Sequence, residues 1–213
     1  MTRIKICGLT REIDVDAAVA AGADAVGFVF YAKSPRYVTP ARAAELASRL
    51  PPFVTPVGLF VNASDAELAG ALAAVPNMLV QFHGDETPAD CARVHRPFLR
   101  AARMEAGFDL LDFAHQFSHA QAILLDAHVE GYGGGGKVFD WSLIPRNVPR
   151  PVVLSGGLHA GNVTTGVLQL RPWAVDVSSG VESAKGIKDA SLIQQFCAAV
   201  HAADQPICSR AES

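Results

Sequence analysis

Two side chains that can exchange protons with a ligand stand where apolar, strand-like runs end. Cys7 ends the alternating run Arg3-Ile4-Lys5-Ile6-Cys7, and Gly8 follows it directly. Asp126 ends the apolar run Ile123-Leu124-Leu125 in the same way. A thiol and a carboxyl group at strand ends are candidates for general acid–base chemistry. For Cys7, the structural alternative is a small buried thiol beside a lysine that extends its ammonium to solvent.

The first run also places a cation next to the thiol. Side chains alternate along a strand, so a strand over 3–7 has Lys5 and Cys7 on one face and Ile4 and Ile6 on the other. An unperturbed cysteine, with a pKa of about 8.5, is only slightly ionised at pH 7. Lys5 is therefore a candidate for lowering the pKa of Cys7.

Further polar side chains follow later runs. Arg36 lies in a loop, 30–38, that holds two cations and a proline that restricts its shape. Solvated loop charge is the alternative interpretation of this cation. His83 shares a face with Gln81 after the run 78–82, and we expect a supporting or structural role for His83 ahead of direct catalysis.

The elements that must position these residues form one repeated pattern. Apolar runs alternate with alanine-rich amphipathic stretches, which predicts parallel strands joined by helices. The expected strands are 3–7, 25–30, 54–61, 78–82, 98–103, 122–126, 151–155 and 173–177. The expected helices are 11–21, 40–50, 64–74, 87–95, 108–118, 141–145, 159–170 and 188–203.

Eight such units predict an α/β fold, a single-domain (β/α)8 TIM barrel with its site at the C-terminal ends of the strands. Closure of the barrel would bring the last strand beside the first, and Asp176 would then lie near Cys7. An open, doubly wound sheet is the alternative. The absence of G-x-G-x-x-G after the first run counts against a dinucleotide-binding form of that sheet.

Glycine-rich turns follow the last two apolar runs. Glycines let backbone N–H groups converge on a dianion, and in β/α barrels the loops after the seventh and eighth strands commonly form a phosphate site. We therefore expect a phosphorylated ligand, with plain turns as the alternative. The predicted phosphate-binding residues are Gly156, Gly157, Ser178, Ser179 and Gly180.

A third glycine-rich stretch, 131–136, follows Asp126. Its functional interpretations are a lid or a phosphate-wrapping loop, because glycine lets the backbone approach a ligand closely. A flexible surface loop is the structural interpretation. Asp140 then opens a short helix as a candidate cap.

Composition narrows the class of protein. Of 213 residues, 50% are hydrophobic and 18% are charged, which suits one compact domain over 1–213 with a loose tail from about Asp204. The net charge of −3 provides no global attraction to nucleic acid or to an anionic membrane. No 18-residue apolar run or signal peptide is apparent, so we expect a cytoplasmic protein. The four cysteines, Cys7, Cys91, Cys197 and Cys208, lack disulfide or metal-site spacing and fit reduced thiols.

The ordered motifs resemble the phosphoribosylanthranilate isomerase family of tryptophan biosynthesis, over about residues 3 to 200. The resemblance implies a (β/α)8 barrel without metal or organic cofactor. Its substrate would be a phosphorylated small molecule, and it would act as a monomer or homodimer. The motifs are Lys5-Ile6-Cys7-Gly8-Leu9-Thr10, 30–38, 81–86, Asp126 with Gly131-Tyr132-Gly133-Gly134, Phe139-Asp140-Trp141, Ser155-Gly156-Gly157-Leu158 and 175–182.

The implied reaction is the Amadori rearrangement of N-(5'-phosphoribosyl)anthranilate to 1-(2-carboxyphenylamino)-1-deoxyribulose 5-phosphate. By this resemblance Cys7 is the general base, Asp126 the general acid, and Arg36 the group that faces the anthranilate carboxylate. Lys5, His83 and Asp176 are expected to be supporting residues.

Two departures from the family pattern are visible. The glycine-rich loop has Gly133-Gly134-Gly135-Gly136 in place of Gly-Gly-Thr-Gly, so any hydroxyl contact from that threonine is absent. The segment His159-Ala160-Gly161-Asn162-Val163 replaces Thr-Pro-Glu-Asn-Val and should weaken a helix start.

Two other functions stay open at this point. A barrel of this kind could bind a phosphorylated metabolite without turning it over, although the presence of both Cys7 and Asp126 argues against that. It could also isomerise the related aminoaldose of histidine biosynthesis, alone or as a second substrate. Enzymes of that reaction tend to use carboxylates as both acid and base, so Cys7 favours the anthranilate substrate.

Overall fold

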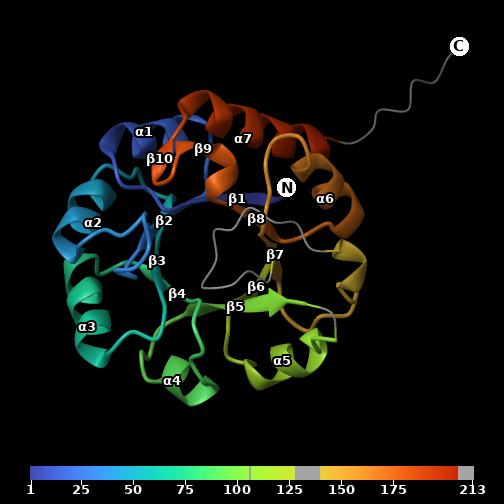
Figure 1. The fold of residues 1–213 in the computed structure, drawn as a ribbon, viewed down its shortest axis with the longest axis horizontal. Helices are drawn as coiled ribbons and strands as arrows, with labels where there is room; N and C mark the ends of the chain where they lie inside the picture. The colour runs from blue at the N-terminus through green and yellow to red at the C-terminus, as the bar shows by residue number, and fades with distance from the viewer. Residues whose placement is uncertain (106, 128–139, 206–213) are drawn as a thin grey trace, which may run out of the picture.

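Eight parallel strands close into a barrel with helices outside it (Figure 1). The computed structural model describes residues 1–105, 107–127 and 140–205. The strands pair in chain order and β8 pairs with β1, so the predicted TIM barrel is confirmed. Both ends of every strand lie within one residue of the expected positions. The strands are β1 Arg3–Cys7, β2 Ala25–Val29, β3 Thr55–Phe60, β4 Leu79–Phe82, β5 Phe98–Met104, β6 Ala122–Ala127, β7 Val152–Leu154 and β8 Ala174–Val177.

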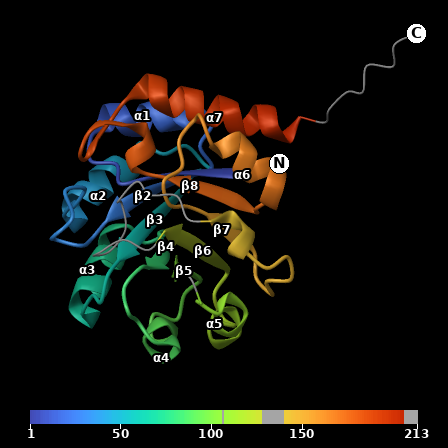
Figure 2. The same ribbon diagram turned by 45° about the vertical axis from the view of Figure 1, so that its right-hand side comes forward.

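Helices between the strands ring the barrel, and Figure 2 shows α1 and α7 side by side. Capping boxes start two of them, at Ser64 with Glu67 and at Thr87 with Asp90, because each pair satisfies backbone N–H groups that the first turn leaves without partners. The helices are α1 Glu12–Ala20, α2 Pro40–Ala47, α3 Asp65–Ala74, α4 Pro88–Ala92, α5 Leu110–Gln116, α6 Val163–Leu170 and α7 Ala190–Asp204, with 3-10 turns η1 Trp141–Leu143 and η2 Ser179–Val181.

Two helix starts test local expectations. Asp140 caps η1 as expected, since its carboxylate accepts a hydrogen bond from Ser142 N at 2.9 Å. Helix α6 begins only at Val163, and its N-cap residue Asn162 makes no side-chain cap. This agrees with the weak helix start that the departure from the family pattern predicts.

Two apolar layers hold the barrel together. The larger one joins the outer face of the sheet to the helices and includes Phe28, Phe60 and Phe196. Members of the smaller layer alternate along the strands with members of the larger one, so they face the barrel interior. The inner layer consists of Val57, Leu99, Ala101, Ala122, Leu124, Val153 and Ala174.

Polar side chains continue the inner-facing rows toward the C-terminal ends of the strands. On β6 the row runs Ala122, Leu124 and Asp126, and on β8 it runs from Ala174 to Asp176. The apolar part of each row packs the barrel, and the next inner-facing position carries a carboxylate to its mouth. The period of two along a strand therefore decides which polar residues reach the site.

The segment before the last helix differs from expectation. We expected a helix over 188–203, but α7 begins at Ala190 because the Asp189 side chain caps it there. The preceding residues form an antiparallel hairpin of β9 (Glu182–Ala184) and β10 (Ile187–Lys188). Lys188 therefore belongs to a strand and not to a helix.

This hairpin packs against the loop that follows β2. Gly186 has a φ of +79°, which favours glycine, and a Cβ there would lie 2.6 Å from the backbone oxygen of Pro35. Thr10 Oγ1 donates a hydrogen bond to the Gly186 oxygen at 2.9 Å. A side chain at position 186 would therefore separate the hairpin from the loop that carries Arg36.

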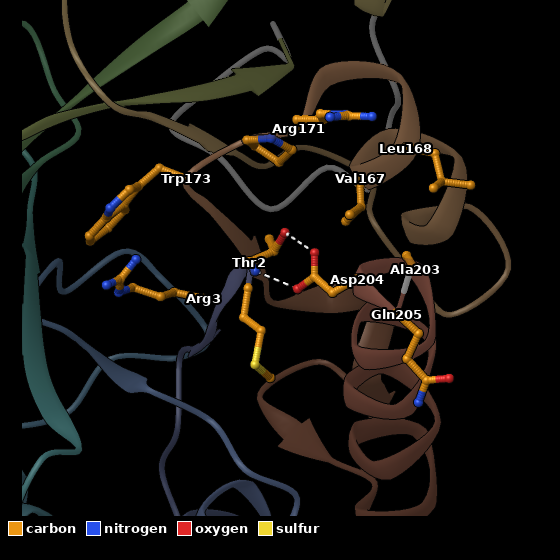
Figure 3. A pocket seen from close by; sticks show the side chains of 11 residues that line it. Thr2, Arg3, Val167, Leu168, Arg171, Trp173, Ala203, Asp204 and Gln205 are labelled. Carbon is orange, nitrogen blue, oxygen red and sulfur yellow. Dashed lines mark hydrogen bonds between the residues drawn. The ribbon is translucent and has the colours of Figure 1, made fainter. Parts of the chain in front are cut away.

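The two ends of the described chain meet at the N-terminal end of the barrel. Figure 3 shows a pocket there, with Asp204 directed toward Thr2. The Asp204 carboxylate accepts hydrogen bonds from Thr2 N and, at 3.0 Å, from Thr2 Oγ1. Helix α7 thus includes the first residue of the expected tail, and 206–213 lie outside the described residues. The Arg3 guanidinium carbon is 4.6 Å from the centroid of the Trp173 ring, at the end of β1 opposite Cys7.

In the described ranges, no helix has both the length and the apolar content needed to cross a membrane.

Candidate active site

The C-terminal end of the barrel collects polar side chains from segments far apart in the sequence. Cys7, Asp126 and Asp176 continue the inner-facing rows of β1, β6 and β8, and His83 and Ser155 follow β4 and β7. All five are buried. Because parallel strands bring their C-terminal ends to one edge, residues from separate motifs meet at one site.

Glycines on both sides make room for the Cys7 thiol and its surroundings. Cys7 is 4% exposed and pairs with Gly27 of β2. A Cβ on Gly27 would lie 2.7 Å from Cys7 Sγ, so a side chain there would displace the thiol. Gly8 has a φ of +79°, and a side chain there would overlap the stem of Arg36.

Lys5 and Asp176 form a buried ion pair next to Cys7. Lys5 Nζ lies 2.7 Å from Asp176 Oδ1, and Ser155 Oγ donates to Asp176 Oδ2 at 3.3 Å. The two charged residues face each other in the register of β1 and β8. Barrel closure was expected to bring Asp176 near Cys7, and Asp176 faces the residue two positions before it. Burial opposes a charged lysine, but the contacts with Asp176 and Cys7 together outweigh it and hold the pKa of Lys5 above its ordinary value.

Burial raises the pKa of the Cys7 thiol above its ordinary value. Asp176 acts in the same direction, while Lys5 and Lys188 oppose it without outweighing the burial. Lys5 therefore acts as expected, but the expected net lowering of the Cys7 pKa is wrong. Desolvation favours the neutral thiol, and the carboxylate of Asp176 offsets part of the field of Lys5.

Asp126 belongs to a hydrogen-bonded chain with His83 and Gln81. His83 Nε2 lies 3.1 Å from Asp126 Oδ2, and His83 Nδ1 lies 3.1 Å from Gln81 Nε2. An amide nitrogen only donates, so in this amide orientation Nδ1 accepts and a neutral imidazole donates from Nε2 to the carboxylate. His83 therefore contacts Asp126 directly and can orient it, as a supporting residue would.

The loop that carries His83 is held by its own buried contacts. Glu86 accepts hydrogen bonds from Gly84 N at 2.8 Å and from Asn62 N at 2.7 Å. Arg100 Nη2 donates to the backbone oxygens of Gly84 and Glu86 at 3.1 and 3.2 Å. These bonds satisfy the backbone of the loop and fix the position from which His83 reaches Asp126.

Arg36 forms a bidentate pair with Glu182, a residue that sequence reasoning did not assign. Arg36 Nε and Nη2 lie 2.7 and 2.8 Å from the two Glu182 oxygens. Within the described ranges, the third nitrogen, Nη1, makes no hydrogen bond to protein. Although burial opposes its ionisation, contacts with Arg36 and Lys188 hold the pKa of the Glu182 carboxyl below its ordinary value.

Lys188 is the other functional candidate that sequence reasoning missed. Its ammonium donates to Glu182 Oε1 at 2.9 Å, to Ser178 O at 2.9 Å and to Ser178 Oγ at 3.3 Å. Burial lowers the pKa of Lys188, although Glu182 favours its charged form. The turn Ala184-Lys185-Gly186-Ile187 is the signal that could have indicated a hairpin here in place of a helix start.

The predicted phosphate-binding turns lie together after β7 and β8. Gly156 and Gly157 have φ of +79° and +66°, and both are partly exposed. In the part of the chain that the structure describes, the backbone N–H groups of Gly156, Gly157, Ser179 and Gly180 donate to no protein acceptor. Backbone donors of this kind suit an anion.

The two turns touch each other, and one predicted hydroxyl is engaged by protein. A Cβ on Gly180 would overlap the backbone oxygen of Leu158, so only glycine allows this approach. Ser178 Oγ donates to the Cys7 backbone oxygen at 3.0 Å and contacts Lys188. The Ser178 side chain therefore links β8 to the end of β1.

Some expectations fall on residues that the structure does not describe. The glycine-rich stretch 131–136 and Cys208 lie outside the described residues. Cys91 and Cys197 are buried free thiols, as is Cys7. No group of three or more His, Cys, Asp or Glu side chains that could hold a metal ion occurs in 1–105, 107–127 and 140–205.

Comparison with known proteins gives a consistent result over nearly the whole chain. The model of the N-(5'-phosphoribosyl)anthranilate (PRA) isomerase family matches residues 4–199. The N-(5'-phosphoribosyl)anthranilate isomerase of Methylibium petroleiphilum is 74% identical, over 98% of each chain.

Solved structures of phosphoribosylanthranilate isomerases are also similar to this chain. A phosphoribosylanthranilate isomerase in complex with reduced 1-(o-carboxyphenylamino)-1-deoxyribulose 5-phosphate is 39% identical with a TM-score of 0.85, over 95% of this chain and 100% of that one. A structure of monomers of the dimeric phosphoribosylanthranilate isomerase from Thermotoga maritima is 38% identical with a TM-score of 0.84, at the same coverage.

Proposed function

The chain belongs to the N-(5'-phosphoribosyl)anthranilate isomerase family and is an isomerase of tryptophan biosynthesis, and we propose that Cys7 and Asp126 are its proton-transfer groups. One observation carries this proposal. The thiol and the carboxyl group continue inner-facing rows at the same end of the barrel, on strands separated by β7 and β8. Both are buried, so a ligand between them would meet an acid and a base in a site that excludes bulk water.

The reaction assigns one step to each group. Asp126 in its acid form protonates the ribose ring oxygen, and cleavage of the bond from C1' to that oxygen leaves an imine. The imine acidifies the hydrogen on C2', which the Cys7 thiolate removes to give an enolamine. Tautomerisation of the enolamine yields the ketone product.

The surroundings of Cys7 set the pH at which it can act as a base. Because its pKa lies above the ordinary value, kcat/KM should rise with pH above neutrality as the thiolate forms. Lys5 and Lys188 are the cations that favour the thiolate. We assign Lys5 and Asp176 as supporting residues because they form the ion pair beside the thiol, and His83 because it contacts Asp126.

The two anionic ends of the substrate are assigned to two groups of donors. The relative described above holds a ligand with a carboxyphenyl group and a 5-phosphate. We assign the aromatic carboxylate to Arg36, whose Nη1 has no hydrogen bond within the described ranges. The phosphate is assigned to the turns 156–157 and 178–180, because the backbone N–H groups of Gly156, Gly157, Ser179 and Gly180 have no acceptor among the residues that the structure describes.

We infer that the chain acts as a monomer or a homodimer, and the relative from Thermotoga maritima is dimeric. Light scattering coupled to gel filtration measures the mass in solution and decides between the two.

Cys7→Ser and Asp126→Asn test the proton-transfer roles. Each variant should lose about a hundred to ten thousandfold in kcat, the usual contribution of one general acid or base. Affinity for the reduced product analogue should stay within a few fold. The measurements are steady-state turnover, calorimetric titration with the analogue and the thermal midpoint.

Cys91→Ser is a matched control, because Cys91 is a buried thiol on α4. It should keep wild-type kcat. Near wild-type kcat in Cys7→Ser, or a loss of activity that follows a loss of folding, would show that Cys7 is a structural thiol.

A further inference from the structure

A buried cluster of three charged side chains joins the loop after β2 to the β9–β10 hairpin. Glu182 stands between two cations, since both its oxygens contact Arg36 and Oε1 also contacts Lys188. The side chains of Arg36, Glu182 and Lys188 are 10%, 6% and 0% exposed. None of the roles assigned above uses Glu182.

The bidentate contact restricts how the guanidinium can be placed. An arginine that uses Nε and one Nη on a carboxylate is held in the plane of that carboxylate, which leaves the remaining Nη as its free donor. The stem of Arg36 is confined as well, because any side chain at Gly8 would overlap it. Arg36 is therefore positioned before a ligand arrives.

Charge counting explains the presence of Lys188. An arginine paired only with a glutamate forms a neutral unit, which attracts a carboxylate weakly. Lys188 adds a second positive charge, so Arg36, Glu182 and Lys188 together carry a net charge of +1. The cluster can thus hold the guanidinium in one orientation and still attract an anion.

We propose that Glu182 is a positioning residue that holds Arg36 for the aromatic carboxylate of the substrate, while Lys188 keeps the cluster cationic. The proposal rests on the role proposed above for Arg36. Glu182 acts through Arg36 and touches no reacting atom. Glu182 should therefore affect how strongly the site prefers a ligand that has the ring carboxylate over one that lacks it, more than it affects the rate of proton transfer.

The experiment compares two ligands, the reduced product analogue and the same compound without its ring carboxylate. The ratio of their dissociation constants, measured by calorimetry, is the carboxylate discrimination. The deciding variant is the double substitution Glu182→Gln with Lys188→Met, which keeps the net charge of the cluster at +1 and removes the bidentate contact. Its discrimination should fall about tenfold, the effect of losing roughly one charge-assisted hydrogen bond.

In Glu182→Asp, which keeps Lys188 and its contacts with Ser178, affinity for the ligand without the carboxylate should stay within about twofold. In turnover of the same variant, KM should rise more than kcat falls, because the contact between Glu182 and Arg36 concerns binding and not proton transfer. Lys185→Met is the matched control, since Lys185 is an exposed cation on the same hairpin. Its discrimination should equal that of the wild type.

If the carboxylate discrimination of the double variant falls about threefold or more, the proposal is supported, and a smaller change overturns it. If its thermal midpoint shows that it does not fold, Glu182→Asp decides by the same threshold, because aspartate keeps the charge and shortens the reach to Arg36. Arg36→Ala distinguishes the carboxylate-binding role of Arg36 from the positioning role of Glu182. Unchanged discrimination in Arg36→Ala refutes the role of Arg36 itself, whereas loss in Arg36→Ala with no loss in the Glu182 variants refutes only the positioning role.

Discussion

The two sides of the barrel mouth hold Cys7 and Asp126, the two residues proposed to transfer protons, by different means. On β1 and β8, Cys7 lies beside the ion pair of Lys5 and Asp176, whose atoms are 2.7 Å apart. On β4 and β6, Asp126 is held by a chain of neutral groups through His83 and Gln81, with two contacts of 3.1 Å. One side is organised by full charges and the other by groups that can exchange donor and acceptor roles.

The difference matches the role proposed for each residue. A fixed ion pair would keep its geometry while Cys7 gains and loses a proton. In the proposed mechanism Asp126 acts both as a carboxylic acid, which donates, and as a carboxylate, which accepts. We expect the His83 tautomer and the Gln81 amide to reverse together when Asp126 is protonated, since both groups can donate or accept.

The largest predicted effect on stability comes from breaking the ion pair of Lys5 and Asp176. Asp176→Asn removes the counter-ion of the buried Lys5 ammonium and should lower the free energy of unfolding by about 3–5 kcal/mol. Asp176 is also one of the groups that raise the pKa of Cys7, so the rise of kcat/KM with pH should move to lower pH. Urea unfolding and a pH profile measure both effects.

An exposed ion pair provides the control for this variant. Asp16 contacts Arg49 with side chains that are 50% and 41% exposed, and Asp16→Asn should cost less than about 1 kcal/mol. Equal losses in Asp176→Asn and Asp16→Asn would contradict the view that the buried pair organises this side of the site.

A smaller effect should follow from removing the contact between Gln81 and His83. Gln81→Met keeps a similar volume but removes the partner of His83, so Asp126 is oriented less well. We expect kcat to fall about tenfold and the free energy of unfolding to fall by only about 1–2 kcal/mol, the value of one buried hydrogen bond. Gln116→Met, at an exposed position of α5, is the control. Unchanged kcat in Gln81→Met would assign Gln81 to packing alone.

The smallest predicted effect is the pH dependence of stability that follows from the raised pKa of Cys7. A thiol whose pKa is raised by folding contributes full stability below its unfolded pKa of about 8.5, and that stability is lost as pH rises toward the folded pKa. The unfolded chain releases its proton first, so the free energy of unfolding falls over this range. Cys7→Ser removes this contribution, and between pH 7.5 and 9.5 the wild type should lose about 1 kcal/mol more than the variant.

Burial also raises the pKa of Cys91 to about 12 and that of Cys197 to about 11. These two thiols contribute equally to both proteins and cancel in the comparison. Urea unfolding at the two pH values is the measurement. A difference between the two proteins that does not change with pH would show that folding leaves the Cys7 pKa where it is in the unfolded chain.

The residues that reach the mouth of the barrel could be predicted because their positions depend only on neighbouring residues in the same strand. Side chains alternate along a strand, so the inner-facing rows that contain Leu124 and Ala174 lead to Asp126 and Asp176 two residues later. The same alternation placed Lys5 and Cys7 on one face. The start of the last helix was less predictable, since the hairpin before it packs against the loop after β2 through Gly186 and Pro35.

The barrel, its eight strands and the polar residues that end them follow from the amino-acid sequence, because periodicity and turn chemistry are encoded within a few neighbouring residues. The pairing of those polar residues depends instead on how distant segments pack. Arg36 and Glu182 are 146 positions apart, and their contact exists only because the hairpin packs on the β2 loop. The direction of the Cys7 pKa shift was decided there as well, since burial depends on everything that surrounds the thiol, whereas alternation shows only that Lys5 is beside it.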